Sequence, residues 1–434
     1  MAILLGGIMA ASLAAPCSVS AAEKTTLTFW HAMGGTNGEV LQQIVDDFNA
    51  SQDEIEVKAE YQGTYDDTIT KLKAAMQSDS GLPDVCQMYD VGTKFMYDSG
   101  AVIPVEDKFE STGYDKSSVM EVISSYYTVD GKQYAMPFNV STPKLYYNKD
   151  VNDAAGLDPE TPPTTYDEVL EDAKKIVESG AAPVGYSQAI YGWFFEQQLA
   201  GLGVTYGNND NGRKEAVTAV DFDSNGGGLK VFDMWKKLYD SGCFEDYGTT
   251  TADTQTAFFS GQVGMIIEST AILKNAVDSS PFEVGTGYLP RIEQNDEGGV
   301  IIGGGSLWLT DTGNEANEDA GWKFIEYITT PDVQAKWSMG TGYFAINEKA
   351  YETDDMKAYL KENPNFETAI NQLKDSPVNC NTAGVLSGVQ TEARLTFNEI
   401  MPQVYDGKLT TQDAVDQLAA SVNKAIENYN ESIK

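Results

Sequence analysis

The chain has 434 residues, a length that predicts two or three domains of roughly 150 residues each. Its 65 acidic residues outnumber its 29 basic residues and give a formal net charge of −36. This charge excludes the basic face of a nucleic-acid-binding protein and disfavours an anionic membrane surface as a partner.

The N-terminal stretch "MAILLGGIMAASLAAPCSVSAAEK" carries an apolar run followed by small residues. This pattern predicts a secretory signal peptide over residues 1–22, with cleavage near Ala22. No Lys or Arg precedes the apolar run, and Cys17 leaves a lipidated N-terminus open as the alternative. No later stretch approaches the roughly 20 apolar residues that span a bilayer, so we expect a periplasmic or extracellular protein.

Strands and helices alternate along the first hundred residues. "TTLTFWH" (25–31) and "EIEVKAEYQG" (54–63) alternate as strands, and "GEVLQQIVDDFNASQ" (38–52) has the apolar spacing of a helix. A second amphipathic helix, "YDDTITKLKAAMQS" (65–78), precedes a third strand in "LPDVCQMYDVG" (82–92). Strands separated by helices favour parallel β-α-β units and therefore an α/β fold.

The same alternation continues through the second half of the chain. Helices are predicted at 166–179 and 227–240, strands in "GTGYLPRI" (285–292) and "IIGGGSLWLT" (301–310), and mostly helices after residue 318. No repeat of fixed period and no Pro- or Ser-rich linker divides the chain. We therefore expect two lobes that the chain crosses several times rather than separate domains on a string.

Few residues could support catalysis, a metal ion or a cofactor. His31 is the only histidine, and no G-x-S-x-G elbow supplies a nucleophile for it to activate. It is therefore predicted to be a polar residue at a strand end that faces the cleft between the two lobes. Cys86, Cys243 and Cys380 allow at most one disulfide and form no zinc motif. Carboxylate pairs could serve a glycosidase, but 65 acidic residues make any pair unspecific. We expect no metal and no cofactor.

The run "IIGGGSLWL" (301–309) places three glycines inside a strand. No lysine follows them, so the run lacks the residue that a nucleotide-binding loop uses to reach phosphates. Glycine within a strand marks a bulge or a close approach of the backbone to another group. The residues alone leave open what that group is.

Seven segments in the same order along nearly the whole mature chain carry a family resemblance. They are "LTFWHAMGG", "LPDVCQMYDVG", "PFNVSTPKLYYNKD", "GLDPETPPTTYDE", "SGQVGM", "IIGGGSLWL" and "TGYFAIN". Together they resemble the extracellular solute-binding proteins, family 1, of bacterial ABC importers. The resemblance implies a two-lobe periplasmic-binding-protein type II fold of the α/β class, with mixed sheets flanked by helices and a ligand cleft between the lobes.

The resemblance also implies how the chain is divided and what it works with. Residues 25–137 and 290–340 are expected to form lobe 1, and residues 138–289 and 341–434 to form lobe 2. The expected role is that of a monomeric binding protein and not an enzyme. Its partners would be a small-molecule ligand, the ABC permease subunits and their cytoplasmic ATPase.

Within this family the likeness is to members that bind glycerol phosphates. Carried over position by position, the residues expected to contact phosphate are Ser141, Ser269, Gly304, Tyr343 and Arg394. We expect the Gly304 N–H to donate to the phosphate, so Gly304→Val should abolish binding while leaving the fold intact.

Three more positions are expected to face the rest of the ligand. Tyr65 and Asp90 would face the glycerol, although the family has Glu at the second position. Trp193 remains where the family tends to show two tryptophans, and Ile190 replaces the other. Glycerol-3-phosphate and a glycerophosphodiester such as glycerophosphocholine therefore both stay open, with a neutral sugar or a secreted carbohydrate-active enzyme as the alternatives.

Overall fold

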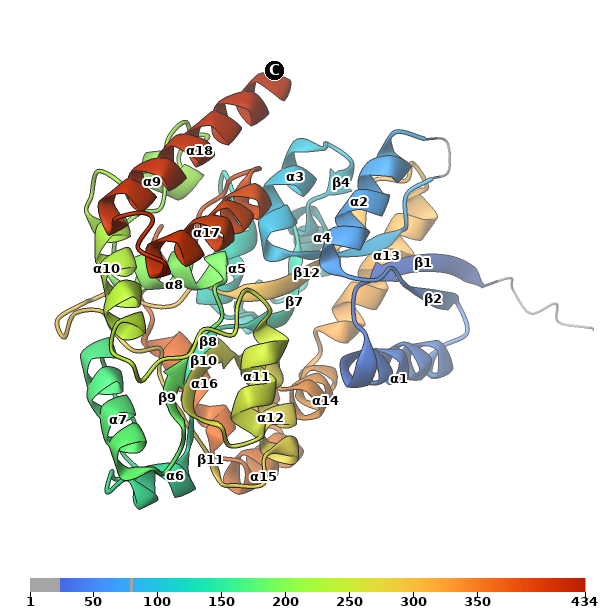
Figure 1. Ribbon diagram of the computed structural model, residues 1–434. Helices are drawn as coiled ribbons and strands as arrows, with labels where there is room; N and C mark the ends of the chain where they lie inside the picture. Colours follow the sequence, from blue (N-terminus) through green and yellow to red (C-terminus); the bar gives the residue numbers. More distant parts are fainter. Residues whose placement is uncertain (1–23, 79–80, 434) are drawn as a thin grey trace, which may run out of the picture.

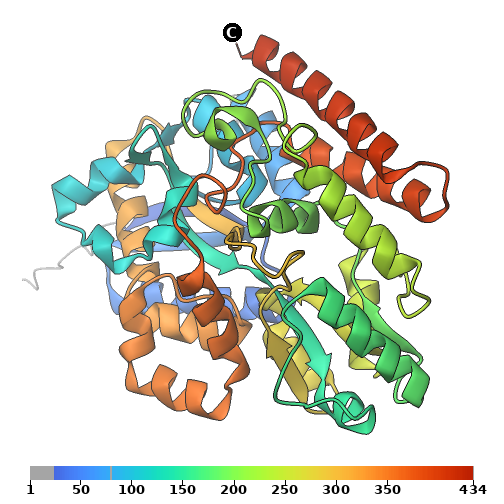
Figure 2. The same ribbon diagram turned by 90° about the vertical axis from the view of Figure 1, so that its left-hand side faces the viewer.

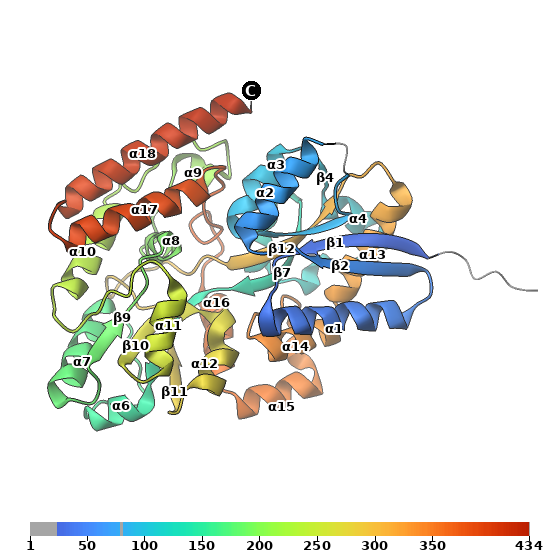
Figure 3. The ribbon, with the colours of Figure 1, turned by 45° about the vertical axis from the view of Figure 1, so that its right-hand side comes forward.

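The computed structural model describes residues 24–78 and 81–433. The signal peptide predicted over residues 1–22, with Cys17, lies outside the described residues. The described chain forms two bodies, each with a β-sheet flanked by helices (Figures 1 and 3). This confirms the predicted α/β architecture with mixed sheets.

The first sheet has the strand order β2-β1-β3-β12-β4, and β7 also pairs with β12. β1 is parallel to β2 and β3, as the β-α-β pattern predicts, whereas β12 is antiparallel to β3, β4 and β7. The strands of this sheet are β1 (Thr25–His31), β2 (Ile55–Tyr61), β3 (Val85–Tyr89), β4 (Val102–Ile103), β7 (Met136–Ser141) and β12 (Gly303–Thr310).

Helices cover both faces of the first sheet (Figure 3). They bury one apolar core that includes Phe29, Val85 and Trp308. The helices of this body are α1 (Gly35–Ser51), α2 (Tyr65–Met76), α3 (Thr93–Asp98), α4 (Val105–Thr112), α5 (Glu121–Ser124), α13 (Glu315–Ile328), α14 (Pro331–Thr341) and α15 (Asp354–Glu362). A short hairpin joins β5 (Thr128–Val129) to β6 (Lys132–Gln133).

The second sheet has the order β11-β8-β10-β9 and is also mixed. β8 is antiparallel to β10 and β11, and β9 is parallel to β10. Its strands are β8 (Pro143–Asn148), β9 (Val184–Ser187), β10 (Val263–Ser269) and β11 (Val284–Gly287). The predicted strand over 285–292 is therefore only partly formed, because the chain leaves the sheet after Gly287.

Most of the remaining helices surround the second sheet, and the long pair α17 and α18 lies along the outer edge of this body (Figure 2). They are α6 (Lys149–Ala154), α7 (Tyr166–Ser179), α8 (Gly192–Gly201), α9 (Asn208–Gly212), α10 (Gly227–Tyr239), α11 (Thr251–Phe259), α12 (Leu273–Ser279), α16 (Asn365–Asp375), α17 (Gln390–Tyr405) and α18 (Thr411–Ser432). Their largest core includes Phe195, Trp235 and Phe397.

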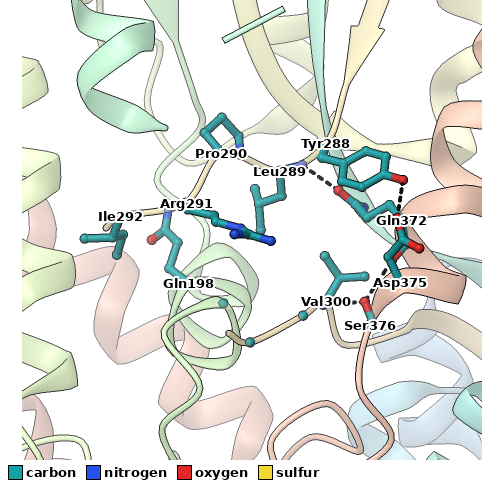
Figure 4. A pocket seen from close by; sticks show the side chains of 13 residues that line it. Gln198, Tyr288, Leu289, Pro290, Arg291, Ile292, Val300, Gln372, Asp375 and Ser376 are labelled. Carbon is teal, nitrogen blue, oxygen red and sulfur yellow. Dashed lines mark hydrogen bonds between the residues drawn. The ribbon is translucent and has the colours of Figure 1, made fainter. Parts of the chain in front are cut away.

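Segments that cross between the two bodies are bonded to one another (Figure 4). The Tyr288 hydroxyl donates to Asp375 at 2.7 Å, and the Val300 N–H donates to the Ser376 hydroxyl at 3.1 Å. These bonded segments enclose a small pocket of about 110 Å3.

The chain also crosses between the two bodies at a single residue, Thr142, which lies between β7 and β8. The predicted lobe boundary at 137/138 falls within β7, and the division into lobes stays a prediction.

The three cysteines of the described chain are free thiols. Cys86 is buried in β3, where burial raises its pKa to about 12. Cys243 and Cys380 are partly exposed. No disulfide therefore joins any two of these three described cysteines.

His31 is buried at the end of β1, where its ring lies 5.6 Å from that of Phe29 and 5.9 Å from that of Tyr61. Its Nδ1 accepts a hydrogen bond from the Met33 N–H at 3.3 Å. Burial lowers its pKa from 6.5 to about 4, because a buried imidazole is disfavoured in its charged form. His31 does not line the ligand pocket described below.

We expect the imidazole of His31 to titrate near pH 4 in the folded protein. Because the folded state favours neutral His31, its contribution to stability is present above pH 6.5 and is lost as pH falls from 6.5 to about 4. His31 is the only histidine, so a single imidazole resonance followed by NMR gives the measurement directly. Titration near pH 6.5 would contradict the burial argument.

Candidate ligand-binding site

All eight site residues predicted from the sequence line one pocket of about 240 Å3, which both sheets and their helices form. Tyr65 begins α2, Asp90 follows β3, and Ser141 and Gly304 come from β7 and β12 of the first sheet. From the other body, Trp193 lies on α8, Ser269 ends β10 and Arg394 lies on α17. The eight residues are Tyr65, Asp90, Ser141, Trp193, Ser269, Gly304, Tyr343 and Arg394.

One wall of the pocket is aromatic. Helix α2 begins at Tyr65 because Thr64 and Asp67 form a capping box, in which each side chain bonds the other's backbone N–H. The Tyr65 ring stacks on Tyr89 with centroids 5.1 Å apart and an interplanar angle of 8°. Its hydroxyl accepts a hydrogen bond from Asn139 Nδ2 at 2.6 Å. The position and rotation of this ring are thereby fixed.

Helix α8 is buried along almost its whole length yet carries three polar residues, Glu196, Gln197 and Gln198. Gln197 exchanges two hydrogen bonds with the backbone of Ile301, at 2.7 and 2.8 Å. Gln198 donates to Tyr166 Oη at 2.8 Å and accepts from Trp235 Nε1 at 2.6 Å. These bonds satisfy the buried amides and hold α8, with Trp193, against the chain that enters β12.

Glu196 on the same helix forms a buried ion pair with Arg394. Arg394 Nε donates to Glu196 Oε1 and Nη2 donates to Oε2, both at 2.7 Å. Arg394 Nη2 also donates to Asp90 Oδ2 at 2.7 Å, and Gln390 Nε2 donates to Glu196 Oε1 at 2.6 Å. Arg394, Glu196 and Asp90 are each 7% exposed or less. One guanidinium therefore joins both bodies of the molecule through two carboxylates.

This arrangement changes the expected role of two residues. Burial alone would lower the pKa of Arg394, but the Asp90 and Glu196 carboxylates raise it well above its usual value. Burial raises the pKa of Glu196, and Arg394 partly offsets that effect. The Arg394 fork is thus already occupied, and Asp90 is paired with it rather than free. Among the described residues, Nη1 of Arg394 has no hydrogen-bond partner and stays open to a ligand.

Further polar groups face the pocket from the second body. Glu268 accepts from Gln255 Nε2 at 3.0 Å and from the Ser269 N–H at 2.6 Å, and burial raises its pKa. Trp193 Nε1 is buried without a hydrogen-bond partner within the described chain. An orphaned buried donor that lines a pocket is suited to a ligand acceptor.

The glycines of β12 have a structural cause that the sequence did not reveal. A Cβ at Gly304, whose φ is +92°, would lie 1.9 Å from the Asn139 carbonyl oxygen, and one at Gly303 would lie 2.7 Å from the Trp193 ring. The pairing of β7 with β12 also shifts register between Gly305 and Ser306. The expectation that Gly304→Val leaves the fold intact is therefore wrong, since the side chain would collide with backbone.

Several pocket residues were missed by sequence reasoning: Tyr191, Thr251, Gln255, Glu268, Ala271, Ile272 and Gly303, with Glu196 behind Arg394. One signal was available. "YGWFFEQQLAG" is an apolar helix interrupted by a carboxylate, and a charge in a buried run requires a partner. The identity of that partner, 198 residues away, is a property of the fold.

Two α/β bodies with mixed sheets, crossed several times by the chain and holding a polar, aromatic pocket between them, define a two-lobe ligand-binding protein. The family model for bacterial extracellular solute-binding proteins matches residues 43–368. The chain belongs to this family. Among the described residues, no helix is both long and apolar enough to cross a membrane.

Among curated relatives, the chain is 30% identical over 417 residues to the sn-glycerol-3-phosphate-binding periplasmic protein UgpB of Escherichia coli K12, covering 94% of each chain. Relatives of this kind are solute-binding components of ABC importers and not enzymes. The chain is therefore a substrate-binding protein of this class.

Solved structures agree on the fold and differ in their ligands. The UgpB of Mycobacterium tuberculosis in complex with glycerophosphocholine superposes with a TM-score of 0.80 at 20% identity, over 94% of this chain and all of that one. A cyclic α-maltosyl-1,6-maltose-binding protein from Arthrobacter globiformis gives a TM-score of 0.77 at 25% identity, with the same coverage. The fold alone therefore does not choose between phosphate esters and sugars.

Proposed function

We propose that this protein captures a glycerol phosphate ester, either sn-glycerol-3-phosphate or a glycerophosphodiester, and delivers it to an ABC permease. The observation that carries the proposal is that all eight residues carried over from glycerol-phosphate-binding members line one pocket. The similarity to the E. coli protein over 94% of the chain supports it. We also propose that the chain is exported with a signal peptide over residues 1–22 and works as a monomer.

The donors of the pocket are suited to a phosphate group. Arg394 offers Nη1, and Ser141, Ser269 and Tyr343 bring hydroxyls into the same pocket. Hydrogen bonds to a charged group contribute about 1.5–3 kcal/mol each, so three or four could support micromolar binding after the cost of association. Trp193 Nε1 adds a donor toward the rest of the ligand.

A neutral sugar is the second candidate. The Arg394 guanidinium is already matched by Asp90 and Glu196, and the pocket walls include Tyr65, Tyr89, Tyr191 and Trp193. Aromatic faces beside carboxylates suit a sugar, whose hydroxyls donate to carboxylates while its ring stacks. The Arthrobacter structure, named for a maltosyl ligand, supports this candidate.

Titration calorimetry with sn-glycerol-3-phosphate, glycerophosphocholine and maltose separates the candidates. We expect one of the two phosphate esters to bind with micromolar or lower Kd, and maltose to give no heat at millimolar concentration. Ser141→Ala should weaken ester binding about tenfold, because its hydroxyl lines the pocket and makes no other hydrogen bond within the described residues. The matched control, Ser224→Ala, removes an exposed hydroxyl outside the pocket and should leave the affinity for the ester unchanged. Binding of maltose alone would overturn the proposal.

A further inference from the structure

We infer that Glu196 sets the charge selectivity of the pocket, so that it accepts a singly charged phosphodiester in preference to a doubly charged phosphate monoester. This inference rests on the proposed function and assigns a specificity role to a residue that does not line the pocket. Glu196 would act through Arg394 and is therefore a positioning residue.

The geometry of the Glu196–Arg394 pair supports this role. Two parallel hydrogen bonds of 2.7 Å hold Nε and Nη2, and Asp90 takes Nη2 as well. Two of the three guanidinium nitrogens thus point at carboxylates, and only Nη1 is left for a ligand. A monoester dianion gains most from a bidentate fork, which this guanidinium cannot present while Glu196 holds it.

The charge balance around the pocket points the same way. The charged residues that line it are Asp90, Glu268 and Arg394, and Glu196 adds a further carboxylate in contact with Arg394. Among residues 24–78 and 81–433, no Lys or His side chain lines the pocket. One cation faces three carboxylates, so each additional negative charge on a ligand weakens its binding. The effect is stronger because these groups are buried, where charges interact more strongly than in water.

Other groups near Glu196 could share its effect. Arg394 and Gln390 face it from α17, Asp90 approaches from the first body, and Tyr191 and Tyr206 flank it from the chain around α8. Of these, only Asp90 carries a second negative charge, and Asp90 lines the pocket itself. Glu196 is therefore the carboxylate whose charge can be changed without removing a group that touches the ligand.

The test is calorimetry on the full mature chain with sn-glycerol-3-phosphate and with glycerophosphoglycerol, the diester that carries a second glycerol on its phosphate. The affinity ratio of the two ligands is compared between variants, so that the contribution of the extra glycerol cancels. Near pH 8 the monoester carries two negative charges and the diester one, because the second phosphate pKa is about 6. We expect the wild-type protein to bind the diester at least tenfold more tightly. Glu196→Gln should reduce this ratio tenfold or more, whereas Glu196→Asp, which keeps the charge, should largely preserve it.

A pH profile separates charge selectivity from a structural role. In the wild-type protein the ratio should shrink as pH falls from about 8 to about 5.5, because the monoester loses its second charge below a pKa of about 6. Protonation of Glu196 would act in the same direction. In Glu196→Gln the ratio should depend less on pH. If Glu196→Gln does not fold, a wild-type ratio that stays constant between about pH 8 and about pH 5.5 would still overturn the inference, because the pocket would then not discriminate by charge.

Glu268→Gln is the matched control, because it removes one buried carboxylate from the pocket without touching Arg394. It should change the ratio less than Glu196→Gln does, because Glu196 still holds Nε and Nη2 of Arg394 in this variant. A Glu196→Gln protein that binds both esters with the wild-type ratio and pH profile would overturn the inference. A wild-type protein that binds neither ester would instead refute the proposed function, and the role of Glu196 with it.

Discussion

Replacing Arg394 with methionine is expected to lower the free energy of unfolding by about 3–5 kcal/mol, because it leaves buried carboxylates without their cation. Glu196 and Asp90 are each 5% exposed and would face one another across the space that the guanidinium occupied. Methionine keeps most of the length of the arginine stem, so lost packing contributes little. Urea unfolding at neutral pH measures the effect.

The pH dependence of this variant has a definite sign. Burial already raises the pKa of Glu196, and removing Arg394 should raise it further, since the guanidinium now offsets that shift. A carboxyl whose folded pKa is raised adds stability below its unfolded value, about 4.3, and loses it as pH rises through the folded pKa. The deficit of Arg394→Met should therefore be smaller near pH 5 than near pH 8.

The double variant Glu196→Gln/Arg394→Met is the control for this prediction. Because it removes the orphaned carboxylate together with its partner, it should be less destabilised than the sum of the two single variants, by a coupling of about 0.5–3 kcal/mol. Additive effects and an unchanged pH profile would show that the pair does not act as a unit. Binding of phosphate esters should be lost in both proteins that lack Arg394.

How far the sequence predicted the fold depended on whether the signal was local. Helix α7 has the predicted bounds of 166–179, because the capping box of Thr165 and Glu168 marks its start and Gly180, in the left-handed conformation, marks its end. The parallel strands β1 and β2 likewise follow from alternation and an intervening helix. The antiparallel orientation of β12 cannot be predicted from such local patterns, because the chain returns from the second body to pair with β7 only after 160 residues or more.

The site shows the same division. The eight pocket residues were placed by their resemblance to a family, and the structure brings all of them together. The pairing of Arg394 with Glu196 and Asp90 joins residues 198 and 304 positions apart, so no local pattern encodes it. The glycine run of β12 was recognised as a close approach, but its neighbours turned out to be Asn139 and Trp193.

Gly304→Ala is expected to destabilise the protein by about 3 kcal/mol, through strain at a positive φ and through overpacking. The added Cβ would lie 1.9 Å from the Asn139 carbonyl oxygen, and backbone cannot rotate away as a flexible side chain would. Gly313→Ala is the matched control: its φ of +71° is also positive, but no atom of the described residues lies within 4 Å of the new Cβ. It should cost only about 1 kcal/mol. Urea unfolding compares the two.

The same substitution should also disturb the ligand pocket. Asn139 donates to Tyr65 Oη at 2.6 Å and accepts from Gln87 Nε2 at 2.7 Å, so moving its backbone shifts the stacked tyrosines of the pocket wall. We therefore expect Gly304→Ala to weaken ligand binding in the fraction that stays folded, whereas Gly313→Ala should leave it unchanged. Equal stability of the two variants would contradict this prediction, because it would mean that the β7 backbone at Asn139 can move to make room for the new methyl group. The glycine would then serve the ligand rather than the strand pair.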